Sequence, residues 1–191
     1  GNRLRVPFTP PFALLGGPST RLFNRIWFHR PQRRNRRMPH HRFLFPLDGV
    51  AEWNRLYGPR GFFQHQCVLP PDSEREALTA IMSCITQAGT GSFLAVLKRF
   101  GPLASPGLIS FSRPGTTLAL DFPNRGDATL SLLDRLDAIV AEAGGAVYPA
   151  KDARMSGTHF RQFFSNWPAF STHIDPKFSS NFWRRVMADI E

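Results

Sequence analysis

Cysteine is scarce in this chain, and neither of the two cysteines has a partner at metal-like or redox-like spacing. Cys67 and Cys84 fall in a predicted strand and a predicted helix. We therefore expect buried free thiols and a protein from a reducing compartment. The histidines are scattered, with neither His159 nor His173 spaced for a shared metal, so the sequence predicts no metal site. No Ser/His/Asp or Cys/His catalytic grouping can be recognised either.

Long apolar runs are also missing. No stretch approaches the roughly 18 residues that a membrane-spanning helix needs. The chain begins with Gly1-Asn2-Arg3, without an apolar leader segment or an initiating methionine. We expect a fragment or processed piece of a protein that is cytoplasmic or peripheral on the inner face of the membrane.

Acidic residues are nearly absent from the first third of the chain. Residues 1 to 60 hold 12 Lys/Arg and 2 Asp/Glu, whereas residues 61 to 191 hold 12 of each. Residues 1 to 45 form a predicted basic arm, because they combine prolines and glycines with the run Arg33 to Arg37. Only Leu22 to His29 favours a short apolar helix there. We expect this arm to bind an anionic membrane surface.

Residues 46 to 191 are predicted to form one folded domain. The chain is 42% hydrophobic and 13% aromatic, which is enough for a core. Ser73 and Glu76 have capping-box spacing at the start of a helix. Hydrophobic periodicity predicts strand, helix, strand, strand, helix and strand over 62–69, 73–88, 92–100, 116–122, 127–143 and 146–148. This order is typical of an α+β fold with a ferredoxin-like split βαβ unit, an antiparallel sheet with flanking helices. The tail from Thr158 is expected to pack on it as short helices.

Two predicted strands carry candidate binding groups. Strand geometry directs Gln64 and Gln66 to one face, where amides suit sugar hydroxyls because each offers a donor and an acceptor. A solvated edge strand would show the same pattern. Lys98 shares a strand face with Phe100, and its ammonium is directed at a phosphate or flavin, or else extends into water.

The segment Tyr148-Pro149-Ala150-Lys151-Asp152-Ala153-Arg154 places an aromatic ring and three charged groups within seven residues. A cation between hydrophobic elements can hold an anionic or electron-rich ligand. A solvated loop is the alternative. Asp152 and Arg154 are expected to pair with neighbours.

Several motifs occur together in a fixed order. They are Trp53-Asn54-Arg55-Leu56-Tyr57-Gly58-Pro59, Phe63-Gln64-His65-Gln66, Leu97-Lys98-Arg99-Phe100-Gly101-Pro102, Leu120-Asp121-Phe122-Pro123 and the segment from Tyr148 to Arg154. Over residues 43 to 188 the chain resembles the C-terminal region of FAD-linked oxidoreductases of the vanillyl-alcohol-oxidase type. The resemblance is closest to the decaprenylphosphoryl-β-D-ribose 2'-oxidase family.

That resemblance implies a substrate-binding (cap) domain of an FAD-dependent enzyme acting on CH-OH groups. The implied reaction oxidises a ring alcohol of a polyprenyl-phosphate-linked pentose to a ketone, with hydride passing to flavin N5. FAD would be bound mainly by a domain that is absent from this chain, so the chain alone should be inactive. The implied site residues are Lys151 as the catalytic residue at the flavin, Tyr148 beside flavin and substrate, and Gln64, Gln66, Lys98 and Phe100 at the substrate.

One departure and two alternatives accompany the resemblance. Where the family has Ser-Asp-Met-x-Arg-Arg, this chain has Ser180-Asn181-Phe182-Trp183-Arg184-Arg185, so an amide replaces a carboxylate. An aldonolactone oxidase of the D-arabinono-lactone type would act on a soluble sugar lactone instead. A basic nucleic-acid-binding module using Arg33 to Arg37 is the alternative outside the enzymes.

Overall fold

A computed structural model describes residues 4–14, 17–29, 37–40, 49–92 and 94–188. Most of the basic run from Arg33 to Arg37 therefore lies outside the described residues. The chain divides into two compact units, residues 1–62 with 123–125 and residues 63–122 with 126–191. The proposed division into an arm over 1–45 and a substrate domain over 46–191 stays a prediction.

The first unit contains short elements. Its helix α1 is longer than the predicted segment from Leu22 to His29, because it begins at Gly17. Strands β1 and β2 pair in parallel. The bounds are β1 Leu4–Arg5, α1 Gly17–His29, β2 Val50–Ala51 and the 3-10 helix η2 Trp53–Tyr57.

The tryptophan-containing motif in η2 holds the first unit together. The Arg55 guanidinium donates hydrogen bonds to the carbonyls of Val6, at 3.1 Å, and Pro7, at 3.0 Å. Gly58 has a φ of +74°, and a Cβ there would lie 2.9 Å from the carbonyl carbon of Phe12. Only glycine allows that approach without strain. The early segment is therefore fixed by contacts that local periodicity does not reveal.

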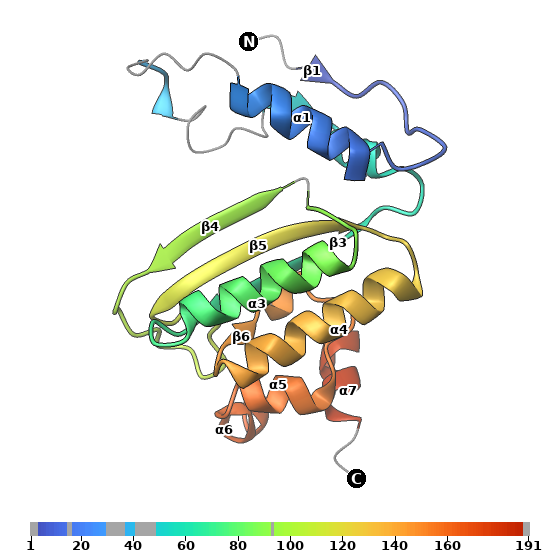
Figure 1. Cartoon of the computed structure of the whole chain (residues 1–191). Helices are drawn as coiled ribbons and strands as arrows, with labels where there is room; N and C mark the ends of the chain where they lie inside the picture. Colours follow the sequence, from blue (N-terminus) through green and yellow to red (C-terminus); the bar gives the residue numbers. More distant parts are fainter. Residues whose placement is uncertain (1–3, 15–16, 30–36, 41–48, 93, 189–191) are drawn as a thin grey trace. The chain divides into compact units, whose positions relative to one another are not determined.

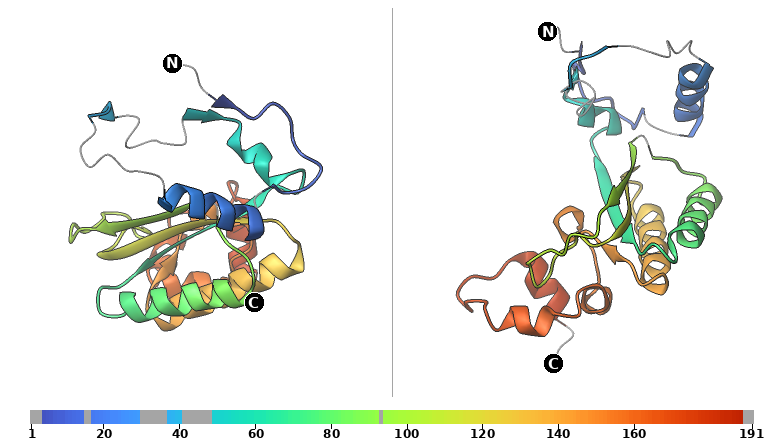
Figure 2. Two further views of the ribbon diagram at one scale, coloured as in Figure 1. Left: turned by 45° about the horizontal axis from the view of Figure 1, so that its top comes forward. Right: turned by 90° about the vertical axis from the view of Figure 1, so that its left-hand side faces the viewer.

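The second unit has the predicted α+β fold. Its four-stranded antiparallel sheet has the order β4-β5-β3-β6, which is the ferredoxin-like arrangement expected from the sequence. Helices α3 and α4 cover one face of this sheet (Figures 1 and 2). The bounds are β3 Phe62–Leu69, α3 Glu74–Gln87, β4 Ala95–Phe100, β5 Gly115–Pro123, α4 Asp127–Glu142, β6 Ala146–Val147, η3 Pro149–Lys151, α5 Gly157–Phe163, α6 Trp167–Ser171 and α7 Asn181–Met187.

The core lies where the sheet, α3 and α4 meet. Ile81 of α3 and Leu136 of α4 are fully buried there, together with residues of β5. The C-terminal segment after Thr158 is expected to pack on this unit as short helices. This is confirmed, because Phe160, Phe163 and Val186 belong to the same core. In the part of the chain that the structure describes, no helix has the length and apolarity to cross a bilayer.

Two serines make contacts that differ from those expected from the sequence. Ser73 precedes α3, but its side chain makes no cap hydrogen bond and instead donates to the carbonyl of Ala143, at 2.8 Å, just after α4. The capping-box prediction is therefore wrong, because the hydroxyl satisfies the end of the neighbouring helix. Strand β4 begins at Ala95 rather than at Ser92. The Ser92 hydroxyl instead accepts the backbone N–H of Asp121, at 2.8 Å.

Candidate functional site

Strand β3 presents its two glutamines on the sheet face opposite α3 and α4. His65, which lies between them, points to the helices and contacts Asp137 of α4, with 3.0 Å between Nε2 and Oδ1. Because successive strand residues alternate, Gln64 and Gln66 lie on the other face. The predicted division of this strand is confirmed.

The neighbouring strands bring further groups to the same face. Gln64 donates to Asp121 Oδ1 at 3.0 Å, and Gln66 donates to Thr117 Oγ1 at 3.1 Å. Lys98 pairs in register with Thr117, and partners across a ladder share a face. We call this surface the polar face, defined by Gln64, Gln66, Lys98, Thr117 and Asp121.

Tyr148 extends the polar face beyond β6. Its backbone N–H donates to the carbonyl of Gln66 at 2.7 Å, continuing the register of β3 with β6. Phe111, from the loop between β4 and β5, lies against its ring at 4.6 Å between centroids. Phe111 also meets Phe100 edge to face, at 6.1 Å. The predicted residues Tyr148 and Phe100 are thus joined by an aromatic ring that the sequence did not single out.

Asp121 is a buried carboxylate on the polar face. It is 1% exposed, and Oδ2 has no hydrogen-bond partner among the described residues. Burial raises the pKa of Asp121, while the Gln64 hydrogen bond and the nearby Lys151 ammonium oppose that rise. Lys151 therefore acts electrostatically on this face.

The polar face and the turn after it carry two ammonium groups, and the Asp121 carboxylate offsets only part of their charge. Neither Lys98 nor Lys151 makes a hydrogen bond or ion pair through its ammonium with the described residues. Lys98 is exposed and Lys151 is half-buried. Two ammonium groups beside two amides can bind a polyol that carries negative charge.

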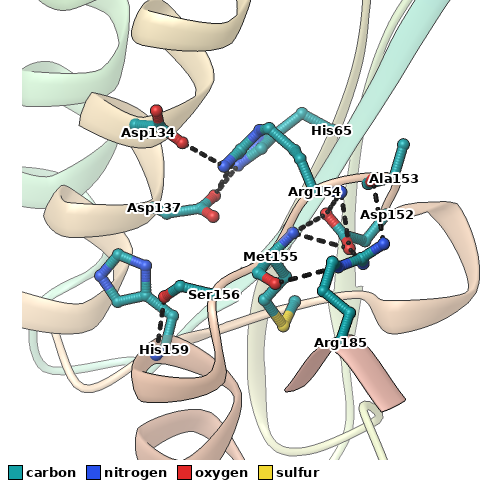
Figure 3. A network of polar contacts seen from close by, with 10 residues as sticks. All are labelled: His65, Asp134, Asp137, Asp152, Ala153, Arg154, Met155, Ser156, His159 and Arg185. Atoms are coloured by element: carbon teal, nitrogen blue, oxygen red, sulfur yellow. Dashed lines mark hydrogen bonds and ion pairs between the residues drawn. The ribbon is translucent and has the colours of Figure 1, made fainter. Parts of the chain in front are cut away.

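The chain after Lys151 is held by a polar network (Figure 3). The Asp152 carboxylate accepts the backbone N–H groups of Arg154 and Met155 at 2.8–3.1 Å. Arg185 of α7 donates to the same carboxylate at 2.6 Å. Charge-assisted bonds of this kind are short and directional. The network therefore fixes the turn from which Lys151 extends.

Arg154 ties this turn to α4 (Figure 3). It pairs with Asp134 at 2.6 Å and with buried Asp137 at 3.0 Å. Burial alone would raise the pKa of Asp137, but the contacts with His65 and Arg154 outweigh it and lower the pKa. The expectation that Asp152 and Arg154 pair with neighbours is confirmed.

The structure brings together the predicted residues Gln64, Gln66, Lys98, Phe100 and Tyr148 on one sheet face, with Lys151 on the following turn. Their roles in binding and catalysis stay predictions. Sequence reasoning missed Thr117, Asp121 and Phe111. A signal for the first two was available, because Thr117, Ala119 and Asp121 alternate with apolar residues along the predicted strand.

The departure at Asn181 is accommodated locally. Its side-chain oxygen accepts a hydrogen bond from Arg184, and the Ser180 hydroxyl caps α7 by accepting the N–H of Trp183 at 3.0 Å. The amide thus retains an arginine contact without an ion pair.

Both cysteines are buried and free, as expected from the sequence. Burial raises the pKa of Cys67 to about 12, so its thiol stays protonated. No group of three or more potential metal ligands occurs within the described ranges.

Comparison with known proteins gives a long match. The chain is 36% identical to a decaprenylphosphoryl-β-D-ribose oxidase of Mycolicibacterium smegmatis over 149 residues, covering 75% of this chain and 32% of the relative. The chain therefore spans about a third of that relative's length.

A second match is shorter. The chain is 36% identical over 95 residues to an uncharacterized protein in the mprA 5' region of Streptomyces coelicolor, covering 50% of this chain and 25% of that protein. No family model matches the chain. The long match confirms the predicted resemblance of this chain to the decaprenylphosphoryl-β-D-ribose oxidase family.

Proposed function

We propose that this chain is the substrate-binding domain of an FAD-dependent oxidoreductase that oxidises a ring alcohol of a polyprenyl-phosphate-linked pentose to a ketone. The observation that carries the proposal is the gathering of Gln64, Gln66, Thr117, Lys98 and Lys151 around one sheet face. The similarity to an oxidase named for a decaprenylphosphoryl ribose supports this substrate class.

The polar face fits both a sugar and a flavin. Amide and hydroxyl groups match ring hydroxyls, while an ammonium without an ion-pair partner matches the negative charge of a reduced flavin. When bound, FAD supplies the acceptor for the hydride. A domain elsewhere in the protein, or a separate chain, would hold most of the cofactor.

Different residues of this chain make different contacts with the substrate. Gln66, oriented by buried Thr117, binds a hydroxyl, and the aromatic rings of Phe100 and Tyr148, joined through Phe111, provide apolar contacts for the pentose. Lys98 supplies a positive charge. These contacts orient the carbon that loses hydride.

Lys151 acts where charge develops. Its ammonium would stabilise negative charge on a bound flavin, and the network around Asp152 and Arg154 keeps the turn in place. Asp121 holds Gln64 by a hydrogen bond and balances part of the charge of Lys151. This turn is the catalytic part of the chain in our proposal.

The proposal is tested by combining this chain with an FAD-binding domain, in one polypeptide or in two, and recording the flavin absorbance anaerobically. We expect a polyprenyl-phosphoryl pentose to bleach the flavin and to yield a keto sugar. Bleaching by an aldonolactone alone would assign the soluble-substrate alternative. Failure of every sugar to bleach a bound flavin would contradict the proposal.

A further inference from the structure

A polar pocket lies in the larger unit, between the loop 101–114 and the connection from α5 to α6. Its volume is about 230 Å³. The polar residues that line it include Ser110, Ser112, Arg113, Ser165 and Asn166. None of the described residues that line it is acidic. The pocket therefore combines a cation with neutral polar groups.

The Arg113 guanidinium is held in a fixed orientation. Its Nη2 donates to the carbonyl of Phe163 at 2.9 Å, at the end of α5, and to the carbonyl of Ser110 at 3.4 Å. Its central carbon lies 5.5 Å from the ring centre of Phe164. Both hydrogen bonds use one nitrogen. Nη1 and Nε make no hydrogen bond with the rest of the described chain.

The charge of Arg113 has no counter-ion within the described ranges. Burial lowers the pKa of Arg113, as expected for a cation that has lost part of its water shell without gaining a carboxylate. An anion in the pocket would replace that lost solvation.

Three neutral side chains around Arg113 are exposed. The hydroxyls of Ser112 and Ser165 and the amide of Asn166 make no hydrogen bond with other described residues. Hydroxyls and amides can all donate to an oxyanion. A planar guanidinium with two free N–H-bearing nitrogens matches two oxygens of a phosphate.

We propose that this pocket is a phosphate-binding site, in which Arg113 supplies the charge and Ser112, Ser165 and Asn166 supply neutral donors. Phosphate could come from a free anion or from a phosphodiester such as that of a lipid-linked sugar. The site stands on its own contacts, and its failure would leave the proposed oxidation untouched.

The test is a titration of the 191-residue chain with inorganic phosphate, followed by NMR of backbone and arginine side-chain N–H groups. We expect saturable shifts at the Arg113 side chain and at the backbone of Ser165 and Asn166. Shifts spread evenly over the basic residues, or no shifts, would overturn the site.

Variants distinguish specific phosphate binding in this pocket from non-specific electrostatic attraction to a basic protein. Arg113→Gln should weaken binding at least about tenfold, because it removes a charge-assisted pair of hydrogen bonds. Arg113→Lys should recover only part of the affinity, since it keeps the charge and loses the fork. Arg135→Gln removes the same charge from an exposed position on α4 and should have no effect.

A milder variant protects the test against misfolding. Ser165→Ala leaves the Arg113 contacts intact and should weaken binding about threefold, the loss of one weak hydrogen bond. Equal affinities in the parent, Ser165→Ala and Arg113→Lys would overturn the assignment.

Dimethyl phosphate distinguishes the source of the anion. If it shifts the same resonances as inorganic phosphate, the pocket accepts a phosphodiester, as a lipid-linked sugar requires. If inorganic phosphate alone shifts them, the ligand is a free phosphate. If neither does, the proposal is wrong.

Discussion

Asp121 and Asp137 show how the two faces of the same sheet treat a buried carboxylate differently. Asp137, on the helix side, has His65 and Arg154 as partners, and its pKa is lowered. Each carboxylate keeps one oxygen without a hydrogen bond among the described residues, but Asp121, on the polar face, is bonded only by the neutral Gln64 amide, and burial raises its pKa. A buried carboxylate without a directly bonded cation costs stability, which is a common property of functional sites.

Replacing Asp121 should stabilise the protein at neutral pH. Because its native pKa is raised above the unfolded value, its contribution to stability is present below about pH 4 and is lost as pH rises through the native pKa. Asp121→Asn removes the buried charge, so its unfolding free energy should exceed the parent's at pH 7. Urea unfolding at several pH values should show the gap closing in acid. Asp72→Asn, at an exposed position, is the control. A less stable Asp121→Asn protein at pH 7 would argue against the assignment.

Replacing Asp137 should do the opposite. Asp137→Asn leaves His65 and Arg154 without their buried anion and should lower the unfolding free energy by about 3 kcal/mol at pH 7. The lowered native pKa places this stabilisation above about pH 4, and it should fade as pH falls through the native pKa. Asp134→Asn removes the exposed partner of Arg154 and should cost under about 1 kcal/mol. Equal losses in the two variants would show that burial does not decide the effect.

Strands and helices were predictable where hydrophobic periodicity is strong. The strand from Phe62 to Leu69 has the expected bounds, and α4 differs from its prediction by one residue at its end. Side-chain contacts between elements were not predictable from periodicity. The Ser73 hydroxyl bonds to the end of α4 rather than to its own helix. The Ser92 hydroxyl bonds to the backbone of β5, and Ser92 does not begin β4.

The start of β5 depends on a glycine. Gly115 has a φ of +143°, and a Cβ there would lie 2.1 Å from the carbonyl oxygen of Leu69. Gly115→Ala should therefore lower the unfolding free energy by about 3 kcal/mol, through strain and backbone displacement. Gly101→Ala adds a methyl group with no atom within 4 Å and is the matched control. Chemical denaturation measures both, and a similar stability for the two variants would contradict the close packing of β5 on β3.

Helix α1 exposes both apolar and basic side chains. Leu22 and Ile26 are 60% and 63% exposed, with Arg21 and Arg25 exposed beside them. We propose that this helix binds anionic vesicles, since each basic residue contributes on the order of 1 kcal/mol there. Replacing Leu22 and Ile26 together by serine should reduce co-sedimentation about tenfold or more. Leu103→Ser, at a residue 90% exposed in the loop 101–114, should leave binding unchanged. Equal binding to neutral vesicles would remove the electrostatic part.

For the whole chain, the order of motifs predicted more than any single residue did. It indicated the α+β fold and the oxidase resemblance, and the two glutamines were placed on the correct face by alternation alone. The position of Lys151 beside Asp121 depends on contacts between residues far apart in the chain, such as Arg185 with Asp152. No local pattern encodes those contacts. Candidate site residues could therefore be identified from the sequence, but their arrangement in space could not be predicted.

The rate of flavin reduction after replacement of Lys151 tests the proposed function most directly. In a protein that combines this chain with an FAD-binding domain, Lys151→Ala should slow anaerobic flavin reduction by the pentose substrate about 100-fold or more, roughly 3 kcal/mol of transition-state stabilisation. Lys151→Arg should recover part of the rate, because it keeps the charge in a different geometry. Stopped-flow absorbance gives the rates, and circular dichroism controls for folding. Reduction of the flavin at the parental rate in Lys151→Ala would show that Lys151 is an ordinary surface lysine and that the polar face is not a catalytic site.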